Sequence, residues 1–381
     1  TSRARISFKP HDFPLVGVTK GERVYLDFGL GEDRLGGAKF SFIQEGIRLA
    51  ITGKVGGRYR VKLTENQEAW IPEDQLQLQP KGTHLPFSLT GNWNVSGDDK
   101  FDVVSVSMSE KLPYASFTEL DPTRINVDVY GAVSNSNWIT QQLTTKEIKN
   151  AYYTQVAKQQ FRITLELNHK QVWGYQIGFR GNTLVIKVRR QPEELKIKAL
   201  TFVLDAGHGG NNNGALGCTG AKEKDVTLTI VSHLKNVLER RGARVTLTRS
   251  DDTNLTMLDR LKKVAVADAD ILVSVHANSI GLTTNPEDTK GTATFYKHVC
   301  YRPLSLFVLS QVLKAGLTSF GNVGSFNFAL NSPTELPNVL VETAFISHPE
   351  DEMKLLDDEF RLELAKRIVD GIEDFLDSCE E

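Results

Sequence analysis

The C-terminal half of this chain alternates short apolar stretches with longer stretches of helical periodicity, and this order restricts its fold more than any other feature. "TFVLDA", "ARVTLTR" and "ADILVSVHAN" indicate strands, and between them "EKDVTLTIVSHLKNVLERRG" and "LTMLDRLKKVAVA" repeat apolar residues at helical spacing. Strands that alternate with helices predict a mostly parallel sheet with helices on both faces. We therefore expect an α/β domain over residues 199–379.

The same alternation continues to the C-terminus. "GTATFYKH" and "PNVLVETAFI" indicate two further strands, and a helix is expected near "LSLFVLSQVLKAGL". A last helix is predicted from the helical spacing of Leu364, Ile368, Ile372 and Leu376. These elements complete the predicted α/β domain.

Two all-β domains are expected before this α/β domain, so the fold class is multidomain. Residues 17–80 contain the short alternating stretches "ERVYLDF", "IRLAITGKV" and "RYRVKLT", which predict a small barrel. "QPKGTHLP" is typical of a linker. Residues 87–196 contain longer alternating stretches, such as "RINVDVYGAV" and "QFRITLELN", which indicate a β-sandwich with one solvated face.

Composition and charge exclude several classes of protein. The 381 residues carry a net charge of −2, from 45 basic and 47 acidic residues, so no nucleic-acid partner is expected. No apolar run approaches the ~18 residues of a membrane-spanning helix, so no transmembrane segment is expected.

"TSRARISFKP", at the start, lacks the apolar core of a signal peptide. Cys218, Cys300 and Cys379 lie far apart and are expected to be reduced.

Polar side chains follow the predicted strands of the α/β domain. His208 comes after "TFVLDAG", His276 and Asn278 end "DILVSVHAN", Glu342 lies in "NVLVETAF", and Glu223 begins the helix after a glycine-rich loop. Because ligands bind at the carboxyl ends of strands in open α/β sheets, we expect these side chains to lie close together. The glycines beside His208 would let the backbone approach a bound ion without steric cost.

Two imidazoles and one carboxylate suit a mononuclear zinc site with an open position for water. A second carboxylate outside the metal shell could take a proton from that water and pass it to a leaving amine, as amide hydrolysis requires. Taken singly, each residue has a simpler explanation, since a histidine after a strand is often structural. Glu223 could be only a favourable charge at a helix N-terminus. Together the residues predict metal-assisted hydrolysis.

Other histidines and two arginines are expected to be structural. The histidines are His84, His169, His233, His298 and His348. Arg249 and Arg260 are expected to anchor the fold through loop contacts and to take no part in the chemistry.

Four stretches carry a resemblance to a known family. "LDAGHGGNNNGALG", "EKDVTLTIVSHLKNVLERRGARVTLTRSDD", "ADILVSVHANS" and "LPNVLVETAFISHPEDEMKLL" resemble the zinc-dependent N-acetylmuramoyl-L-alanine amidases of the Amidase_3 type. The resemblance implies Zn²⁺ bound by His208, Glu223 and His276, with Glu342 as the catalytic residue. It also implies the substrate, the amide that joins N-acetylmuramic acid to L-alanine in peptidoglycan. Asn278 is a candidate substrate-binding residue.

Resemblances upstream suggest how such an enzyme reaches its substrate. "GGRYRVKLTENQEAWIPEDQL" resembles bacterial SH3-like modules, and "KLPYASFTELDPTRINVDVYGA" resembles the AMIN domain that accompanies cell-wall amidases. They imply recruitment to the cell wall or the division site. The family implies an exported enzyme of the bacterial cell envelope, in the periplasm or the wall.

Two other functions stay open at this point. The chain could be a zinc hydrolase that acts on another cell-wall amide or peptide bond, which the products would reveal. It could also be a non-catalytic wall-binding protein, although such a protein needs a degraded site and all four site residues are present. The connection between Ser279 and Gly291 is too short for an occluding helix, so an open site is predicted.

Overall fold

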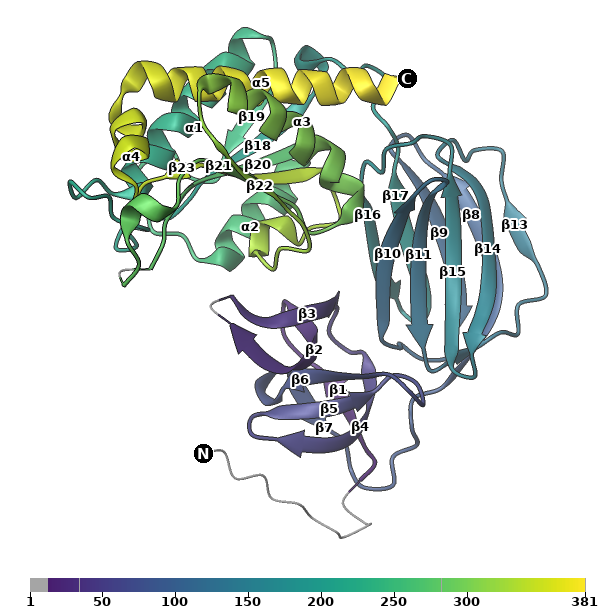
Figure 1. Cartoon of the computed structure of the whole chain (residues 1–381). Coiled ribbons are helices and arrows are strands. Elements are labelled where there is room, and N and C mark those ends of the chain that lie inside the picture. The colour runs from purple at the N-terminus through teal and green to yellow at the C-terminus, as the bar shows by residue number, and fades with distance from the viewer. Residues whose placement is uncertain (1–12, 34, 282, 381) are drawn as a thin grey trace. The chain divides into compact units, whose positions relative to one another are not determined.

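A computed structural model of the chain describes residues 13–33, 35–281 and 283–380. Its contacts divide the chain into two compact units. Figure 1 labels the strands and helices from which they are built. The first contains residues up to 170 together with 175–190, and the second contains residues 171–174 together with residues 191 onward. The first unit is built of strands and the second of alternating strands and helices, so the predicted order of an all-β region before an α/β region is confirmed.

The first strands of the all-β unit form one sheet of antiparallel neighbours, in the order β3-β2-β6-β5-β4-β1-β7. Its strands are β1 (Leu15–Thr19), β2 (Val24–Asp33), β3 (Gly36–Ile43), β4 (Arg48–Val55), β5 (Arg58–Lys62), β6 (Glu68–Pro72) and β7 (Leu76–Leu78). Apolar side chains two residues apart, such as Leu49 and Ile51, lie on the same face of the sheet, are buried and form its core. The SH3-like identity of this sheet stays a prediction.

The rest of the all-β unit contains two sheets. One has the order β10-β11-β15-β14, and the other β12-β8-β9-β17-β16, with β13 beside β8. The strands are β8 (Ser88–Gly97), β9 (Phe101–Met108), β10 (Tyr114–Leu120), β11 (Thr123–Tyr130), β12 (Ala132–Val133), β13 (Ile139–Gln141), β14 (Ile148–Ala157), β15 (Gln160–Leu167), β16 (Tyr175–Arg180) and β17 (Thr183–Arg189). The rings of Trp93 in β8 and Phe161 in β15 lie 6.0 Å apart, so the two sheets pack face to face. The AMIN-like identity stays a prediction.

The second unit is built on one six-stranded sheet with the order β19-β18-β20-β23-β21-β22. Its strands are β18 (Thr201–Ala206), β19 (Arg244–Leu247), β20 (Ile271–Asn278), β21 (Thr292–Phe295), β22 (Ser319–Val323) and β23 (Asn338–Phe345). All neighbours are parallel except β21 and β23, so the predicted mostly parallel sheet is confirmed. The carboxyl ends of β18, β20 and β23 therefore lie at one edge.

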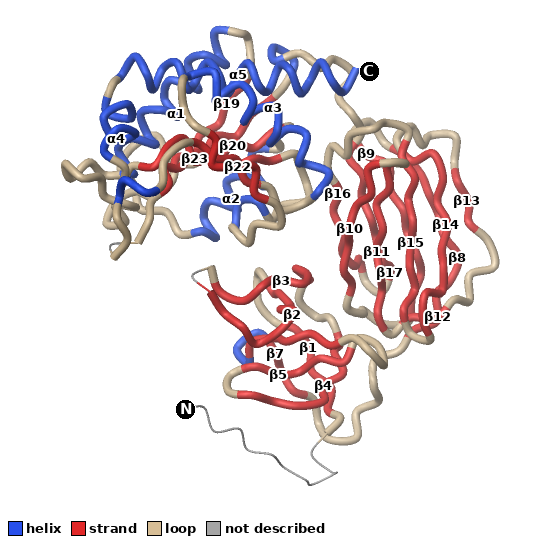
Figure 2. The backbone as a smooth tube through the Cα atoms, viewed as in Figure 1, coloured by secondary structure: helices blue, strands red, loops and turns tan. Residues whose placement is uncertain are grey.

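Helices cover both faces of this sheet (Figure 2). They are α1 (Glu223–Arg240), α2 (Met257–Ala267), α3 (Arg302–Val312), α4 (Pro349–Leu356) and α5 (Asp358–Glu380). Phe202 and Leu204 of β18 join the core made with α1, α3 and α5, whereas Val203 between them joins the core made with α2. Side chains alternate across a strand, so the continuous apolar stretch that marks β18 in the sequence supplies both cores.

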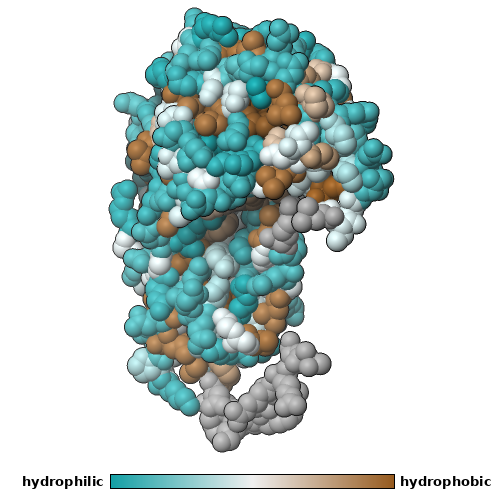
Figure 3. All heavy atoms as spheres, turned by 90° about the vertical axis from the view of Figure 1, so that its left-hand side faces the viewer, coloured by the Kyte–Doolittle hydropathy of each residue, from teal (hydrophilic) through white to brown (hydrophobic). Residues whose placement is uncertain are grey.

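None of the helices in the described part of the chain is long and apolar enough to cross a membrane. The longest, α5, has 23 residues and keeps charged side chains along its length. Figure 3 shows a face of the molecule on which hydrophilic side chains predominate and apolar ones occur in small groups.

Candidate metal centre

His208 lies in the loop that follows β18, where the backbone turns sharply. Its φ is +61°, in the left-handed region that residues with a side chain rarely adopt. Gly207, just before it, lies against the ring of His276: a Cβ at this position would be 2.5 Å from Cε1 of His276. Only glycine permits this approach. This contact is with His276, and the expectation that the glycines let the backbone approach an ion at His208 stays a prediction.

Glu223, the first residue of α1, lies between the two histidines. Its Oε2 is 3.0 Å from Nε2 of His208, and its Oε1 is 2.9 Å from Nδ1 of His276. The carboxylate is buried and also accepts hydrogen bonds from the backbone N–H groups of Ala215 (2.8 Å) and Ala277 (3.2 Å). These contacts fix the carboxylate in one orientation.

His276 lies near the end of β20 and is buried. Its Nδ1 faces Glu223, whereas its Nε2 is buried and has no hydrogen-bond partner among the described residues. Its ring packs edge-on against Phe328, with the ring centres 5.3 Å apart. A buried imidazole nitrogen without a partner is costly in a protein interior.

The ligand atoms of His208, Glu223 and His276 all lie within 4.8 Å of one another. Burial alone would raise the pKa of Glu223, but the hydrogen bonds from the two histidines outweigh burial and hold this pKa far below its usual value. The carboxyl group is therefore ionised, the form that binds a metal. Two imidazoles with one carboxylate are a typical donor set for catalytic zinc, so these residues fit that ion.

Glu342 lies in β23 directly beside His276 of β20, as its register partner. Register partners on neighbouring strands point to the same face of the sheet, so the two side chains share one face. Burial lowers the pKa of His276, but the hydrogen bond and charge of Glu223, together with the charge of Glu342, outweigh it and raise this pKa. A second carboxylate thus lies beside the cluster of three ligands.

Asn278, the last residue of β20, shapes the strand end. Its side-chain oxygen accepts a hydrogen bond from the backbone N–H of Ser279 (2.8 Å), and its carbonyl accepts one from Ile346 (2.8 Å). Its expected role in substrate binding stays a prediction. The connection that follows, residues 279–291, contains one three-residue 3₁₀ turn, Pro286–Asp288, in its described part.

The histidines expected to be structural have partners of their own away from the three-ligand cluster. His233 bonds Asp358 (3.0 Å), His298 bonds the carbonyl of Ser332 (3.0 Å), and His348 caps α4. Sequence reasoning did not single out two residues beside the site, Asp205 and Phe328. Asp205 gave a usable signal, because a carboxylate inside an apolar strand needs buried partners.

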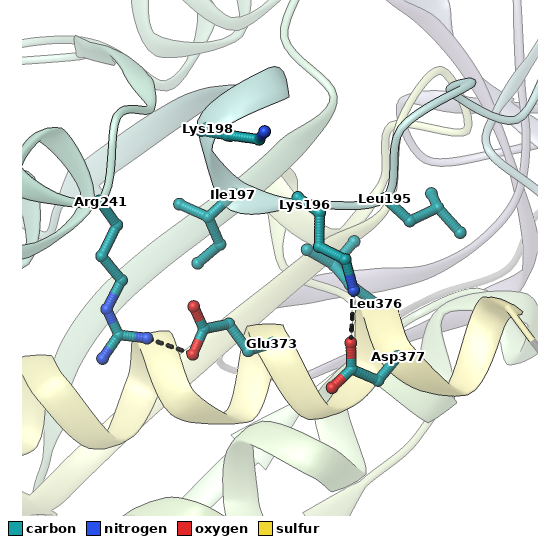
Figure 4. A pocket seen from close by; sticks show the side chains of 8 residues that line it. All are labelled: Leu195, Lys196, Ile197, Lys198, Arg241, Glu373, Leu376 and Asp377. Atoms are coloured by element: carbon teal, nitrogen blue, oxygen red, sulfur yellow. Dashed lines mark hydrogen bonds and ion pairs between the residues drawn. The ribbon is translucent and has the colours of Figure 1, made fainter.

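A surface pocket of the same unit lies elsewhere (Figure 4). It is lined by residues 195–198, which precede β18, and by Arg241, Glu373, Leu376 and Asp377. Arg241 is paired with Glu373, and Lys196 with Asp377 at 3.1 Å. Because these charged side chains are paired with one another, they give no indication that the pocket binds a charged ligand.

Comparison with known proteins identifies relatives of this chain. A family model described as N-acetylmuramoyl-L-alanine amidase, Amidase_3, matches residues 202–374, a range that includes His208, Glu223, His276 and Glu342. YqiI from Bacillus subtilis is 34% identical over 185 residues, which cover 48% of this chain and 87% of YqiI. The probable cell wall amidase LytH from Staphylococcus aureus is 30% identical over 226 residues, which cover 59% of this chain and 74% of LytH.

Solved structures are also among the proteins to which the chain is similar. The catalytic domain of CwlV, an N-acetylmuramoyl-L-alanine amidase from Bacillus (Paenibacillus) polymyxa, is 33% identical, covering 47% of this chain and 98% of that domain with a TM-score of 0.44. The amidase AmiC2 of Nostoc punctiforme is 30% identical, covering 47% of this chain and 97% of AmiC2 with a TM-score of 0.44.

Proposed function

Because the chain belongs to the Amidase_3 family of N-acetylmuramoyl-L-alanine amidases, we propose that it hydrolyses the amide bond between N-acetylmuramic acid and the L-alanine of the peptidoglycan stem peptide. The observation that carries the proposal is the convergence of His208, Glu223 and His276, three residues distant in sequence, within 4.8 Å. The buried Nε2 of His276, which has no hydrogen-bond partner among the described residues, supports a ligand at this point.

His208, Glu223 and His276 would hold a Zn²⁺ ion. When bound, such an ion polarises the scissile carbonyl and makes water more acidic. The chain's own contribution is orientation, because Glu223 is fixed by backbone donors from Ala215 and Ala277 and cannot turn away from the two imidazoles.

Glu342 would move the proton. It neighbours His276 on the same face of the sheet, and this position supports a role in taking a proton from the attacking water. It then donates that proton to the alanine nitrogen as the C–N bond breaks, so that the amine leaves in neutral form. Both steps need one carboxylate that is not a metal ligand, and Glu342 fits this requirement.

The all-β unit would hold the enzyme on its polymer. SH3-like and AMIN-like modules that bind the wall or a division-site partner would raise the local concentration of the catalytic unit at peptidoglycan. The enzyme would then act in the bacterial cell envelope. A hydrolase specific for another cell-wall amide or peptide bond is the alternative, and it would use the same four residues.

The test is product release from purified sacculi with zinc present. Wild-type protein should release stem peptides with a free N-terminal alanine, identified by mass spectrometry. Glu342→Gln should lower the rate by about 100-fold or more, the usual contribution of a general acid–base group, and should still bind zinc. Glu350→Gln, at an exposed glutamate paired with Lys290, is the matched control and should keep the wild-type rate.

Two results would count against the proposal. Full turnover by Glu342→Gln would show that Glu342 is not the group that carries the proton. Products cut at a peptide bond would favour the alternative hydrolase.

A further inference from the structure

Two buried arginines hold the strand end that carries His208. Arg260, in the first turn of α2, is 2% exposed. Its Nη1 donates to Oδ1 of Asp205 (2.5 Å) and to the carbonyl of Ala206 (2.7 Å), and its Nη2 donates to the carbonyl of His208 itself. One guanidinium therefore contacts the backbone on both sides of Gly207.

Arg249, which follows β19, contacts the same strand end from another direction and is 3% exposed. Its Nε donates to the carbonyl of Ala206 (2.9 Å), and its Nη2 donates to the carbonyls of Gly207 (2.7 Å) and Lys224 (2.8 Å). Lys224 is the neighbour of Glu223 in α1. Arg249 therefore ties the loop of one proposed ligand to the helix start of another.

Asp205 connects this arrangement to the third proposed ligand. It is 1% exposed, and it accepts hydrogen bonds from Thr248 (2.6 Å), Arg260 and Ser274 (2.9 Å). Ser274 stands two residues before His276 on β20, so the two side chains point to the same face. The contacts of Asp205, Arg249 and Arg260 therefore reach the segments of all three ligands.

The backbone at His208 needs such support. A residue with a side chain at φ +61° is strained and keeps this conformation only where its surroundings determine it. The carbonyls of Ala206, Gly207 and His208 all accept charge-assisted hydrogen bonds, which are stronger than neutral ones. Without them the loop could relax and turn the imidazole away from Glu223.

We infer that Arg260 and Arg249 are positioning residues for metal binding: they hold the backbone of residues 206–208 so that the imidazole of His208 meets Glu223 and His276. This inference rests on the proposed zinc site. It goes beyond a general anchoring of the fold, because it predicts a loss of metal affinity that acts through His208.

Zinc affinity of the purified, metal-free full chain tests the inference, measured by competition with a chromogenic chelator. Arg260→Lys keeps the positive charge beside Asp205 but cannot reach carbonyls on both sides of Gly207. It should weaken zinc binding by about tenfold to hundredfold, as loss of a group that orients a ligand does. Arg241→Lys, at an arginine paired with Asp370 and Glu373, is the matched control and should leave the affinity unchanged.

The same substitution in a His208→Ala variant shows whether Arg260 acts by positioning His208 or only by stabilising the fold. When His208 is already replaced, in His208→Ala, adding Arg260→Lys should change the remaining zinc affinity by less than about twofold, because coupled residues are not additive. An equal loss in both backgrounds would overturn the inference and assign Arg260 to the fold alone. Circular dichroism of the metal-free variants shows whether they are folded. If Arg260→Lys is not, Arg249→Lys carries the same test.

The outcomes also distinguish this inference from the proposed function. If wild-type protein binds no zinc, or if His208→Ala binds it as tightly as wild type, the proposed zinc site is wrong. If wild type binds zinc through His208 and Arg260→Lys binds equally well, only the positioning role is wrong.

Discussion

Gly207 lies so close to the imidazole of His276 that its missing side chain is part of the candidate site. A Cβ there would be 2.5 Å from Cε1 and 2.6 Å from Nδ1 of His276. The ring cannot simply retreat, because Phe328 packs against it. Gly207→Ala should therefore displace His276 and weaken zinc binding by about tenfold or more, measured by chelator competition.

The control for this substitution is Gly281→Ala in the connection after β20. A Cβ at Gly281 would have no heavy atom within 4 Å, so zinc affinity should be unchanged. If Gly207→Ala binds zinc like wild type, then His276 either has room to move or is not a ligand.

His298 provides a prediction about pH. Burial lowers its pKa to about 4 from an ordinary value of 6.5, although the hydrogen bond to Ser332 acts in the opposite direction. At a pH between these two pKa values, the imidazole is protonated in the unfolded chain and neutral in the folded chain. The free energy of unfolding should therefore fall as the pH falls from 6.5 toward 4. Relative to His298→Gln, wild type should lose roughly 2–3 kcal/mol between pH 7 and pH 4.5 in urea titrations. Parallel curves for the two proteins would contradict the burial of a neutral imidazole.

At the residue scale, the sequence predicted the candidate site where a simple geometric rule applies. His208, His276 and Glu342 could be placed together from the sequence because the carboxyl ends of parallel strands share one edge of the sheet, while their roles in metal binding and catalysis stay predictions. Phe328 was not found, because it lies in an irregular segment without periodicity. From the sequence, Arg260 could be predicted only to anchor the fold. Its three hydrogen-bond acceptors could not be predicted, because which groups lie near its guanidinium depends on the path of the loop in space.

At the scale of elements, the contact of α3 with α5 depends on Gly371. A Cβ at this position would lie 2.5 Å from Cα of Val308 and 2.9 Å from the carbonyl oxygen of Phe307. In an exposed helix, replacing glycine with alanine stabilises by ~1 kcal/mol. Here the added methyl group meets backbone atoms, and overpacking of this kind costs about 1–3 kcal/mol.

We therefore expect Gly371→Ala to be destabilising, by about 1 kcal/mol or more in urea unfolding, despite the better helix propensity. Asn236→Ala, on the exposed side of α1, is the control and should be neutral or slightly stabilising, because only propensity acts there. A stabilising effect of Gly371→Ala would mean that the two helices separate easily.

Elements with clear periodic patterns were predicted, and several elements without such a pattern were missed. The helices α1, α2, α3 and α5 were all expected, because several apolar side chains repeat on one face. No helix was expected at α4, which has eight residues and begins with Pro349. No strand was expected at β22, whose sequence "SFGNV" lacks a clear alternation, or at β3, which begins with two glycines.

At the scale of the whole chain, the two units are not two continuous stretches of sequence. Residues 171–174 lie in the connection between β15 and β16, both of the all-β unit, yet they belong to the α/β unit. Trp173 is 1% exposed in the core around α1, α3 and α5, its ring is 6.1 Å from that of Phe375, and its Nε1 donates to Gln191 (3.1 Å). The sequence could not show this, since "QVWGYQIGF" has the alternation of the neighbouring strands.

This arrangement predicts that the α/β unit depends on a residue outside the range 199–379. Trp173→Ala should destabilise the unit by about 3–5 kcal/mol, the usual cost of removing a buried tryptophan. Trp138→Ala is the matched control, because Trp138 is 60% exposed and exposed substitutions stay within about 0.5 kcal/mol. Because a chain with two compact units need not unfold in a single transition, hydrogen exchange of peptides from β18 and β20 is the appropriate measurement.

A chain that begins at residue 199 should behave like Trp173→Ala or worse, because it also lacks the buried side chains of Leu195 and Ile197. Exchange in its β18 and β20 should be faster than in the full chain. If the shortened chain and Trp173→Ala both protect these strands as well as wild type does, then Trp173 fills space without stabilising the core. In that case the α/β unit folds from residues 199 onward alone, and the contacts of residues 171–174 are a consequence of its fold and not a requirement for it.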